Sequence, residues 1–268
     1  MKKYVVFLMM VVAVAAFGQN KKNARQPVKQ EANKVEPKTN ADTNTAPATG
    51  QDNPNQQAAP AQQLQTSPFI NHYLVKFNVA MRFNDSDAAR DALYDLIVEN
   101  PSNDSLFLSL AMMYYENQKY PSTILVCQEL LARNPKNTTA LELTASSFEA
   151  LNLYDKALQH YETLYLQTNA YPSLYKMAFL QYDLKRFREC AATSDILLSK
   201  KEADELKVSY PTEGNKTKEF PIKVAILNLK GMVAKESGDT AGAKKFFEQV
   251  LAIAPDFTQA KENLAKLK

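Results

Sequence analysis

The sequence predicts an all-α fold, a superhelical solenoid built from about five antiparallel helical pairs. Two observations carry this prediction: Pro101 and Pro135 lie 34 residues apart, and each closes a helix-loop-helix block with a similar pattern of apolar residues. A period of this length is typical of arrays of helical pairs. The blocks cover residues 70–103, 104–137, 138–170, 171–203 and 224–257.

Small residues recur at one position in each half of a block. Small side chains at facing positions let two antiparallel helices pack closely, which explains why these positions repeat. The first helices carry Phe77, Ala111, Ala145, Ala178 and Gly231, and the second helices carry Ala89, Thr123, Ala157, Cys190 and Ala243. Phe77 is the exception to the pattern.

Larger residues recur beside the small ones, and Pro101, Pro135 and Pro255 follow second helices because proline cannot continue a helix. Because of these recurring small, large and proline positions, residues 70–257 resemble the tetratricopeptide-repeat family. The resemblance implies that the solenoid is right-handed. It is clearest in the third and fifth blocks, at Ala145, Phe148, Tyr154, Ala157 and Tyr161, and at Gly231, Ala243, Phe247 and Pro255.

The first 18 residues have the pattern of a secretory signal peptide. Two lysines precede an apolar run from Tyr4 to Phe17, and Gly18 follows it. This run is short for a membrane span, so we expect cleavage after Gly18 and a periplasmic or secreted protein, with an uncleaved anchor as the alternative. Residues 19–67 are rich in Asn, Gln, Pro and Ala and contain no aromatic residue, which predicts a disordered linker.

Two further segments complete the predicted solenoid domain, residues 68–268. The insert 204–222 separates the last two blocks, and its alternation of Val208 with Tyr210 and of Phe220 with Ile222 favours a short β-hairpin, with a disordered loop as the alternative. Residues 256–268 have the pattern of an amphipathic helix that covers the last pair with Phe257, Ala260, Leu264 and Leu267. A solenoid needs such a terminal cap for solubility.

The net charge of the predicted folded part narrows the classes of partner, and the positions of the cysteines decide whether a disulfide is expected. Of 32 basic and 29 acidic residues, two lysines lie in the signal segment, and six basic and four acidic residues lie in the linker, which leaves 24 against 25. We therefore expect no nucleic-acid partner, because the folded part has no excess of positive charge to displace phosphate counterions. Cys127 and Cys190 lie in the second and fourth blocks, with one whole block between them, which is too far for a disulfide, and are interpreted as small core residues.

The sequence offers little for catalysis. The six glycines form no phosphate-binding loop and no nucleophile elbow, and His72 and His160 fall in different blocks without the spacing of metal ligands. We therefore expect no enzymatic activity, no cofactor, no bound metal and no small-molecule substrate.

The resemblance implies where a partner binds, since first helices of this family line a concave groove that holds peptides. The groove positions selected from this chain are Leu108, Met112, Tyr115, Glu142, Glu149, Tyr175, Phe179, Tyr182, Asn228 and Met232. Methionine and aromatic side chains suit an apolar or amphipathic segment of a protein partner. The alternative for these residues is that several of them only pack between neighbouring first helices.

These observations predict a protein interaction scaffold of the bacterial envelope, associated with it through a partner. The alternative is a structural subunit of an outer-membrane, motility or secretion assembly, for which the convex face and the insert would matter more than the groove.

Overall fold

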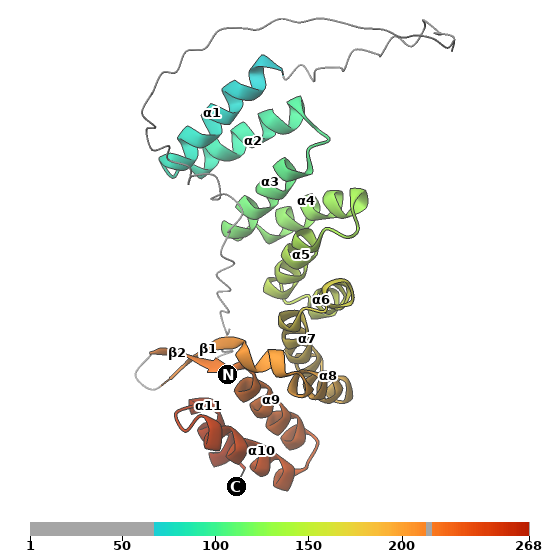
Figure 1. Cartoon of the computed structure of the whole chain (residues 1–268), viewed down its shortest axis with the longest axis vertical. Helices are drawn as coiled ribbons and strands as arrows, with labels where there is room; N and C mark the ends of the chain where they lie inside the picture. Colours follow the sequence, from blue (N-terminus) through green and yellow to red (C-terminus); the bar gives the residue numbers. More distant parts are fainter. Residues whose placement is uncertain (1–66, 213–215, 268) are drawn as a thin grey trace, which may run out of the picture. The chain divides into compact units, whose positions relative to one another are not determined.

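The computed structural model describes residues 67–212 and 216–267, and the expected signal peptide and all of the expected linker except Ser67 lie outside them. The described part contains eleven α-helices, one 3-10 helix and a two-stranded sheet (Figure 1). The first four helical pairs are α1 (Pro68–Arg82) with α2 (Ser86–Glu99), α3 (Asp104–Glu116) with α4 (Tyr120–Arg133), α5 (Thr138–Ala150) with α6 (Tyr154–Thr168), and α7 (Tyr171–Asp183) with α8 (Phe187–Ser199). The fifth pair is α9 (Ile222–Glu236) with α10 (Thr240–Ile253), and α11 (Thr258–Ala265) follows it.

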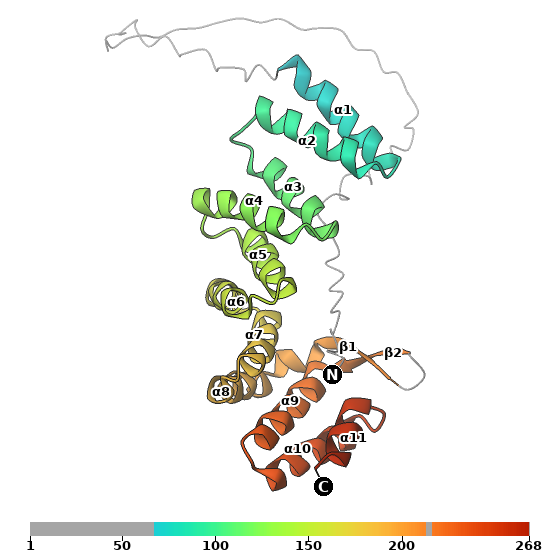
Figure 2. The ribbon, with the colours of Figure 1, turned by 180° about the vertical axis from the view of Figure 1, so that it is seen from behind.

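The pairs stack in chain order, as the sequence predicted. The two helices of each pair pack together, and the second helix of one pair packs on the first helix of the next. First helices α3, α5 and α7 therefore follow one another on one side of the stack, and α4, α6 and α8 follow one another on the other (Figures 1 and 2). Among the described residues, none of the helices combines the length and the apolar character needed to cross a bilayer.

The recurring small positions predicted from the sequence lie where the two helices of each pair cross. Of their ten residues, all but Phe77 are buried, including Ala111, Ala157 and both cysteines, which are free thiols. At Gly231 a Cβ atom would lie 2.4 Å from the ring of Phe247 on α10. The fifth pair thus depends on a glycine at its closest approach.

All five turns within the pairs use the same backbone conformation. One residue in each turn has a positive φ, and the amide of the next residue bonds back to the carbonyl five positions earlier, as Lys119 N does to Tyr114 O at 2.8 Å. This arrangement ends a helix by satisfying its last carbonyls. The residues with positive φ are Asn84 (56°), Gln118 (57°), Asn152 (58°), Lys185 (59°) and Gly238 (83°).

Gln118→Gly is expected to raise the free energy of unfolding, because only glycine adopts this conformation without steric cost. The expected gain is about 0.5–1 kcal/mol, measured as a higher urea midpoint. The matched control is Gln128→Gly in the exposed middle of α4, which should lower the stability by about 1 kcal/mol. A loss at both positions would contradict the role of the turn.

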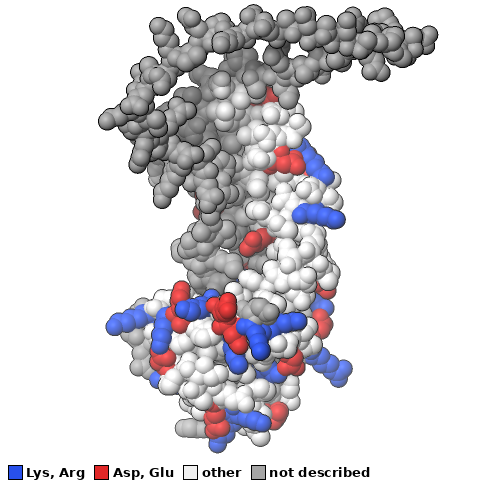
Figure 3. All heavy atoms as spheres, in the orientation of Figure 1, with Lys and Arg blue, Asp and Glu red and all other residues white. Residues whose placement is uncertain are grey.

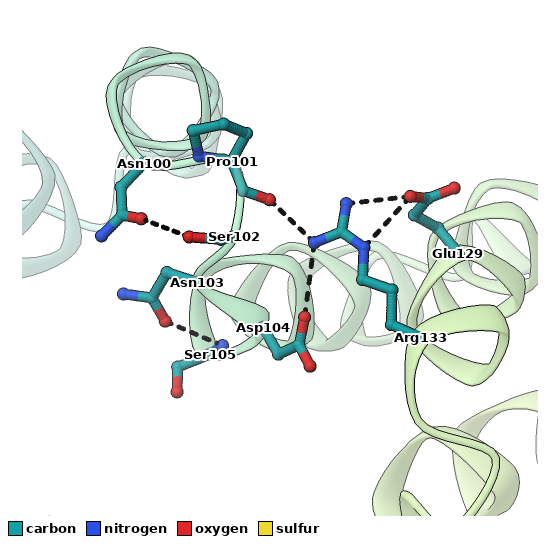
Figure 4. Close-up of polar contacts among 8 residues, drawn as sticks. All are labelled: Asn100, Pro101, Ser102, Asn103, Asp104, Ser105, Glu129 and Arg133. Atoms are coloured by element: carbon teal, nitrogen blue, oxygen red, sulfur yellow. Dashed lines mark hydrogen bonds and ion pairs between the residues drawn. The ribbon is translucent and has the colours of Figure 1, made fainter.

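Polar contacts also repeat between neighbouring pairs (Figure 4). Arg133 at the end of α4 donates to the carbonyl oxygen of Pro101 at 2.7 Å and to Oδ1 of Asp104 at 3.3 Å, while Glu129 accepts from the same guanidinium. One period later, Gln167 on α6 donates to the carbonyl oxygen of Pro135 at 3.2 Å. The 34-residue period therefore recurs in the side chains that hold the loops between pairs.

The insert is an ordered hairpin, so the disordered-loop alternative is wrong for its described residues. A 3-10 helix (Lys201–Glu205) leads into β1 (Lys207–Pro211), which pairs antiparallel with β2 (Thr217–Pro221). The expected strand residue Ile222 instead begins α9. Packing explains why such a small sheet is stable, since its inward residues Val208, Tyr210 and Phe220 are buried in the main core.

The helix α11 is the predicted cap. Phe257 and Ala260 are buried on the last pair, while Leu264 and Leu267 pack partly against the same core. The ring of Phe257 also meets the rings of Tyr210 and Phe220 edge to face, at centroid distances of 5.0 and 5.1 Å. The cap and the hairpin thus share one aromatic cluster.

Candidate functional site

The groove residues predicted from the sequence lie on the first helices α3, α5, α7 and α9, and we call their exposed parts the first-helix surface. Eight of the ten side chains are partly exposed, but Tyr175 and Asn228 are only 5% and 6% exposed. These two residues belong to the interior, so a partner cannot use them as exposed anchors. Their side chains contact the insert and the cap rather than only neighbouring first helices.

The hairpin explains the burial of Tyr175. Its hydroxyl forms a 2.8 Å hydrogen bond with the hydroxyl of Tyr210 on β1, and its ring packs on Phe179 at a centroid distance of 4.8 Å. Burial raises the pKa of Tyr175 well above 10, and raises that of Tyr210 to about 12. Both hydroxyls therefore stay protonated at neutral pH and join the insert to α7.

The cap explains the burial of Asn228. The amide of Asn263 on α11 donates to Oδ1 of Asn228 at 3.2 Å, and the amide of Asn228 points at the sulfur of Met232 at 3.6 Å. The part of the first-helix surface on α9 is thus engaged with the cap. The part on α3, α5 and α7 consists of the other partly exposed positions, namely Leu108, Met112, Tyr115, Glu142, Glu149, Phe179 and Tyr182.

A polar network lies at the centre of that remaining part. Glu149 on α5 accepts hydrogen bonds from Nζ of Lys176 on α7 at 2.9 Å and from the hydroxyl of Tyr161 on α6 at 2.9 Å. Ser146, also on α5, lies 3.0 Å from the same hydroxyl. The network therefore joins two successive pairs and holds the carboxylate of Glu149 in place.

Glu142 lies one turn earlier on the same helix as Ser146 and has a different environment. It is half-buried, and the loss of hydration raises the pKa of its carboxyl, against which the charge of Lys176 acts only in part. A carboxylate in this position lowers the stability of the folded state at neutral pH. Residues that reduce stability in this way are common where a protein binds something.

Glu142→Gln should raise the stability at neutral pH. Because folding raises the pKa of this carboxyl above its ordinary value of 4.5, the folded state holds the proton more tightly than the unfolded state. The free energy of unfolding then falls as pH rises through the interval between the two values, and the loss is complete above the folded pKa. Urea midpoints at pH 4 to 8 test this, with the exposed Glu162→Gln on α6 as control; no gain at pH 7 would contradict it.

The described residues on the face that Figure 3 shows form no large patch of a single charge. Over the C-terminal part of that face, basic side chains intermingle with acidic ones. Within residues 67–212 and 216–267, no three His, Cys, Asp or Glu side chains are grouped closely enough to hold a metal ion. Burial raises the pKa of Cys127 and of Cys190 to about 11, so both remain thiols at neutral pH.

Comparisons with known proteins agree with this architecture. The family profile described as tetratricopeptide repeat matches residues 125–173. A tetratricopeptide-repeat protein from Parabacteroides merdae has 19% identity and a TM-score of 0.58, over 74% of this chain and 72% of its own. A structure of MamA has 14% identity and a TM-score of 0.54, over 74% and 94%.

A third structure, MamA from Desulfovibrio magneticus, has 10% identity and a TM-score of 0.54, covering 70% of this chain and 96% of its own. At these identities the likeness establishes the fold and nothing more. Among curated proteins, none matches the sequence. The stacked helical pairs, the family profile that matches residues 125–173 and the likeness to these structures together show that this chain has a tetratricopeptide-repeat fold.

Proposed function

We propose that this protein is a non-enzymatic scaffold of the bacterial envelope that holds a partner protein on the first-helix surface. The repeat fold supports the general role, since stacked helical pairs present extended surfaces for protein partners. The proposed occupant is an apolar or amphipathic segment that lies across α3, α5 and α7.

The observation that carries this proposal is the combination of side chains on these three helices. Met112, Tyr115 and Phe179 provide adaptable and aromatic area that is partly exposed. Glu142 adds a poorly hydrated carboxylate on α5, the helix between α3 and α7 in the stack. Burial removes part of the hydration that stabilises the charged form of this carboxylate, and a basic side chain in the partner segment would stabilise that form instead. We therefore expect the segment to carry a lysine or arginine among its apolar residues.

Site-specific photocrosslinking in cells tests the proposal. A photoreactive amino acid at Met112, Glu142 or Phe179 should capture the partner, whereas one at Leu125 or Leu166, which are exposed on second helices, should not. Crosslinks from the second helices alone would move the interaction to the other face. Glu142→Lys should then weaken capture from Met112 more than Glu142→Gln does, because it repels a basic partner.

The alternative role as a structural subunit has one observation in its favour. Second helices expose the large apolar residues Val98, Leu125 and Leu166 to solvent. Crosslinking at Leu125 and Leu166 separates the two roles. Export is tested by N-terminal sequencing of the protein from cell envelopes: a start at or near Gln19 supports a cleaved signal, and an intact Met1 in a membrane-extracted form would show an anchor.

A further inference from the structure

One position of the first helices changes its surroundings along the stack. It lies three residues before the recurring small residue, and from α1 to α9 it carries Leu74, Leu108, Glu142, Tyr175 and Asn228. Leu74 is 39% exposed, Leu108 and Glu142 are partly exposed, and Tyr175 and Asn228 are buried. At this position the first-helix surface is therefore open on α1, α3 and α5 and closed on α7 and α9.

The insert and the cap close the last two helices, and each does so with a hydrogen bond. The hydroxyl of Tyr210 on the insert bonds to the hydroxyl of Tyr175 at 2.8 Å, and the amide of Asn263 on the cap donates to Oδ1 of Asn228 at 3.2 Å. In both contacts a segment from outside the repeats lies over a first helix and brings a polar group to the polar side chain there. The chain itself thus shows what a segment bound at this position supplies.

Glu142 occupies the same position on α5 but is covered by neither the insert nor the cap. Burial raises the pKa of its carboxyl, and the charge that opposes this effect belongs to Lys176, whose Nζ bonds to Glu149 at 2.9 Å. A donor from a bound segment would do for Glu142 what Tyr210 and Asn263 do on the next two first helices. Lysine and arginine suit this place best, because they add an opposite charge to the hydrogen bond.

Towards the start of the stack the same position is apolar. Leu108 is followed on α3 by the partly exposed Met112, and Leu74 is followed on α1 by Met81, which is 49% exposed. Leu74 and Met81 are seven residues apart, which places them on the same side of the helix. The apolar part of the first-helix surface therefore continues from α3 onto α1.

We propose that the partner segment extends over α1 and ends at α7 beside the hairpin, an inference that rests on the proposed function of this surface. The segment places apolar side chains at Leu74 and Leu108 and one lysine or arginine at Glu142. The order of these side chains along the segment follows the order of the first helices. The insert closes the site at α7, so α9 and the cap take no part in it.

Selection of peptides from a random library displayed on phage, with the full chain as the target, tests the chemistry. The selected peptides should share a pair of apolar residues with one lysine or arginine on one side of them. Against Glu142→Lys, after a check of helicity and melting temperature, the selection should enrich aspartate or glutamate at the place of the basic residue. Against Glu142→Gln it should lose the preference for a charge. The same basic residue enriched against all three proteins would overturn the pairing with Glu142.

The affinity of the most enriched peptide, labelled with a fluorophore and followed by anisotropy, tests the extent of the site. Leu74→Glu should raise its Kd about tenfold or more. The matched control Val75→Glu changes the next residue of α1, which is 61% exposed on a different side of the helix, and should leave the Kd unchanged. Equal effects of the two substitutions would overturn the extension onto α1.

The same peptide with a photoreactive residue at either end tests the order. The apolar end should crosslink to α1, and the basic end to α5, α7 or the hairpin; crosslinks in the reverse order, or to the cap, would overturn the inference. If Met112→Glu weakens binding and Leu74→Glu does not, the proposed function stands and the extension onto α1 is wrong. A peptide that tolerates both substitutions, or a selection that enriches no sequence, would overturn the inference together with the proposed function.

Discussion

Phe257→Ala should cost about 3–5 kcal/mol and loosen the C-terminal end of the stack, because it removes the centre of the aromatic cluster that joins hairpin and cap. Phe257 is almost completely buried and contacts the rings of Tyr210 and Phe220. Neighbouring pairs in such arrays can unfold separately, so we expect the loss to be concentrated in α9, α10, α11 and the hairpin. Hydrogen exchange should show faster amide exchange in these segments than in α3 to α6.

Two additional measurements make this expectation specific. The pKa of Tyr210, held at about 12 by burial, should fall towards 10 in the variant when followed by ultraviolet titration. The control Ile253→Ala removes a large apolar residue that is exposed at the end of α10, and should change the stability by less than about 0.5 kcal/mol. Equal effects of the two substitutions would show that the cluster does not hold the end of the stack.

The local packing pattern was predictable from the sequence. Each small residue needed at a helix crossing recurs at a fixed interval, as Ala111, Ala145 and Ala178 do, so the period alone reveals the pairs. The alternation of Val208 with Tyr210 and of Phe220 with Ile222 favoured the hairpin but left a disordered loop open as the alternative, and Ile222 in fact begins α9. The turns were less visible, since Gln118 and Lys185 adopt positive φ without being glycine or asparagine.

The limits of prediction at the site have a physical cause. Tyr175 occupies a first-helix position that faces outward in a regular repeat, and only the folded insert brings Tyr210 against it. Asn228 is covered in the same way by the cap, through Asn263. Each contact joins a residue of a helical pair to a residue 35 positions later that lies outside the repeats, in the insert or in the cap, so a pattern of repeats contains no information about it.

The sequence also could not distinguish Glu142 from Glu149. Both lie on α5 two turns apart, but Glu149 receives hydrogen bonds from Lys176 and Tyr161, whereas burial raises the pKa of Glu142. One carboxylate joins neighbouring pairs, and the other is the better candidate for contact with a partner. This difference arises from α6 and α7, which approach α5 only in the folded stack.

Gly231→Leu should be among the most destabilising substitutions in the chain, with an expected loss of about 3 kcal/mol or more. Even a single Cβ atom at this position would lie 2.4 Å from the ring of Phe247, so a leucine must push α9 and α10 apart. The smaller change Gly231→Ala separates packing from backbone effects. Helix propensity alone predicts a gain of about 1 kcal/mol, whereas overpacking predicts a loss of about 1–3 kcal/mol.

A double-mutant cycle with Phe247 decides between these effects. Phe247→Leu alone should lower the stability because it leaves a cavity, but it should also make room for the new methyl group. The loss in Gly231→Ala, Phe247→Leu should therefore be smaller than the sum of the two single losses, as measured by urea midpoints. Lys235→Leu, one turn later on α9 and partly exposed, serves as control and should have little effect. If Gly231→Ala instead raises the stability and the losses are additive, the close approach of α9 and α10 at this glycine does not govern the packing of the fifth pair.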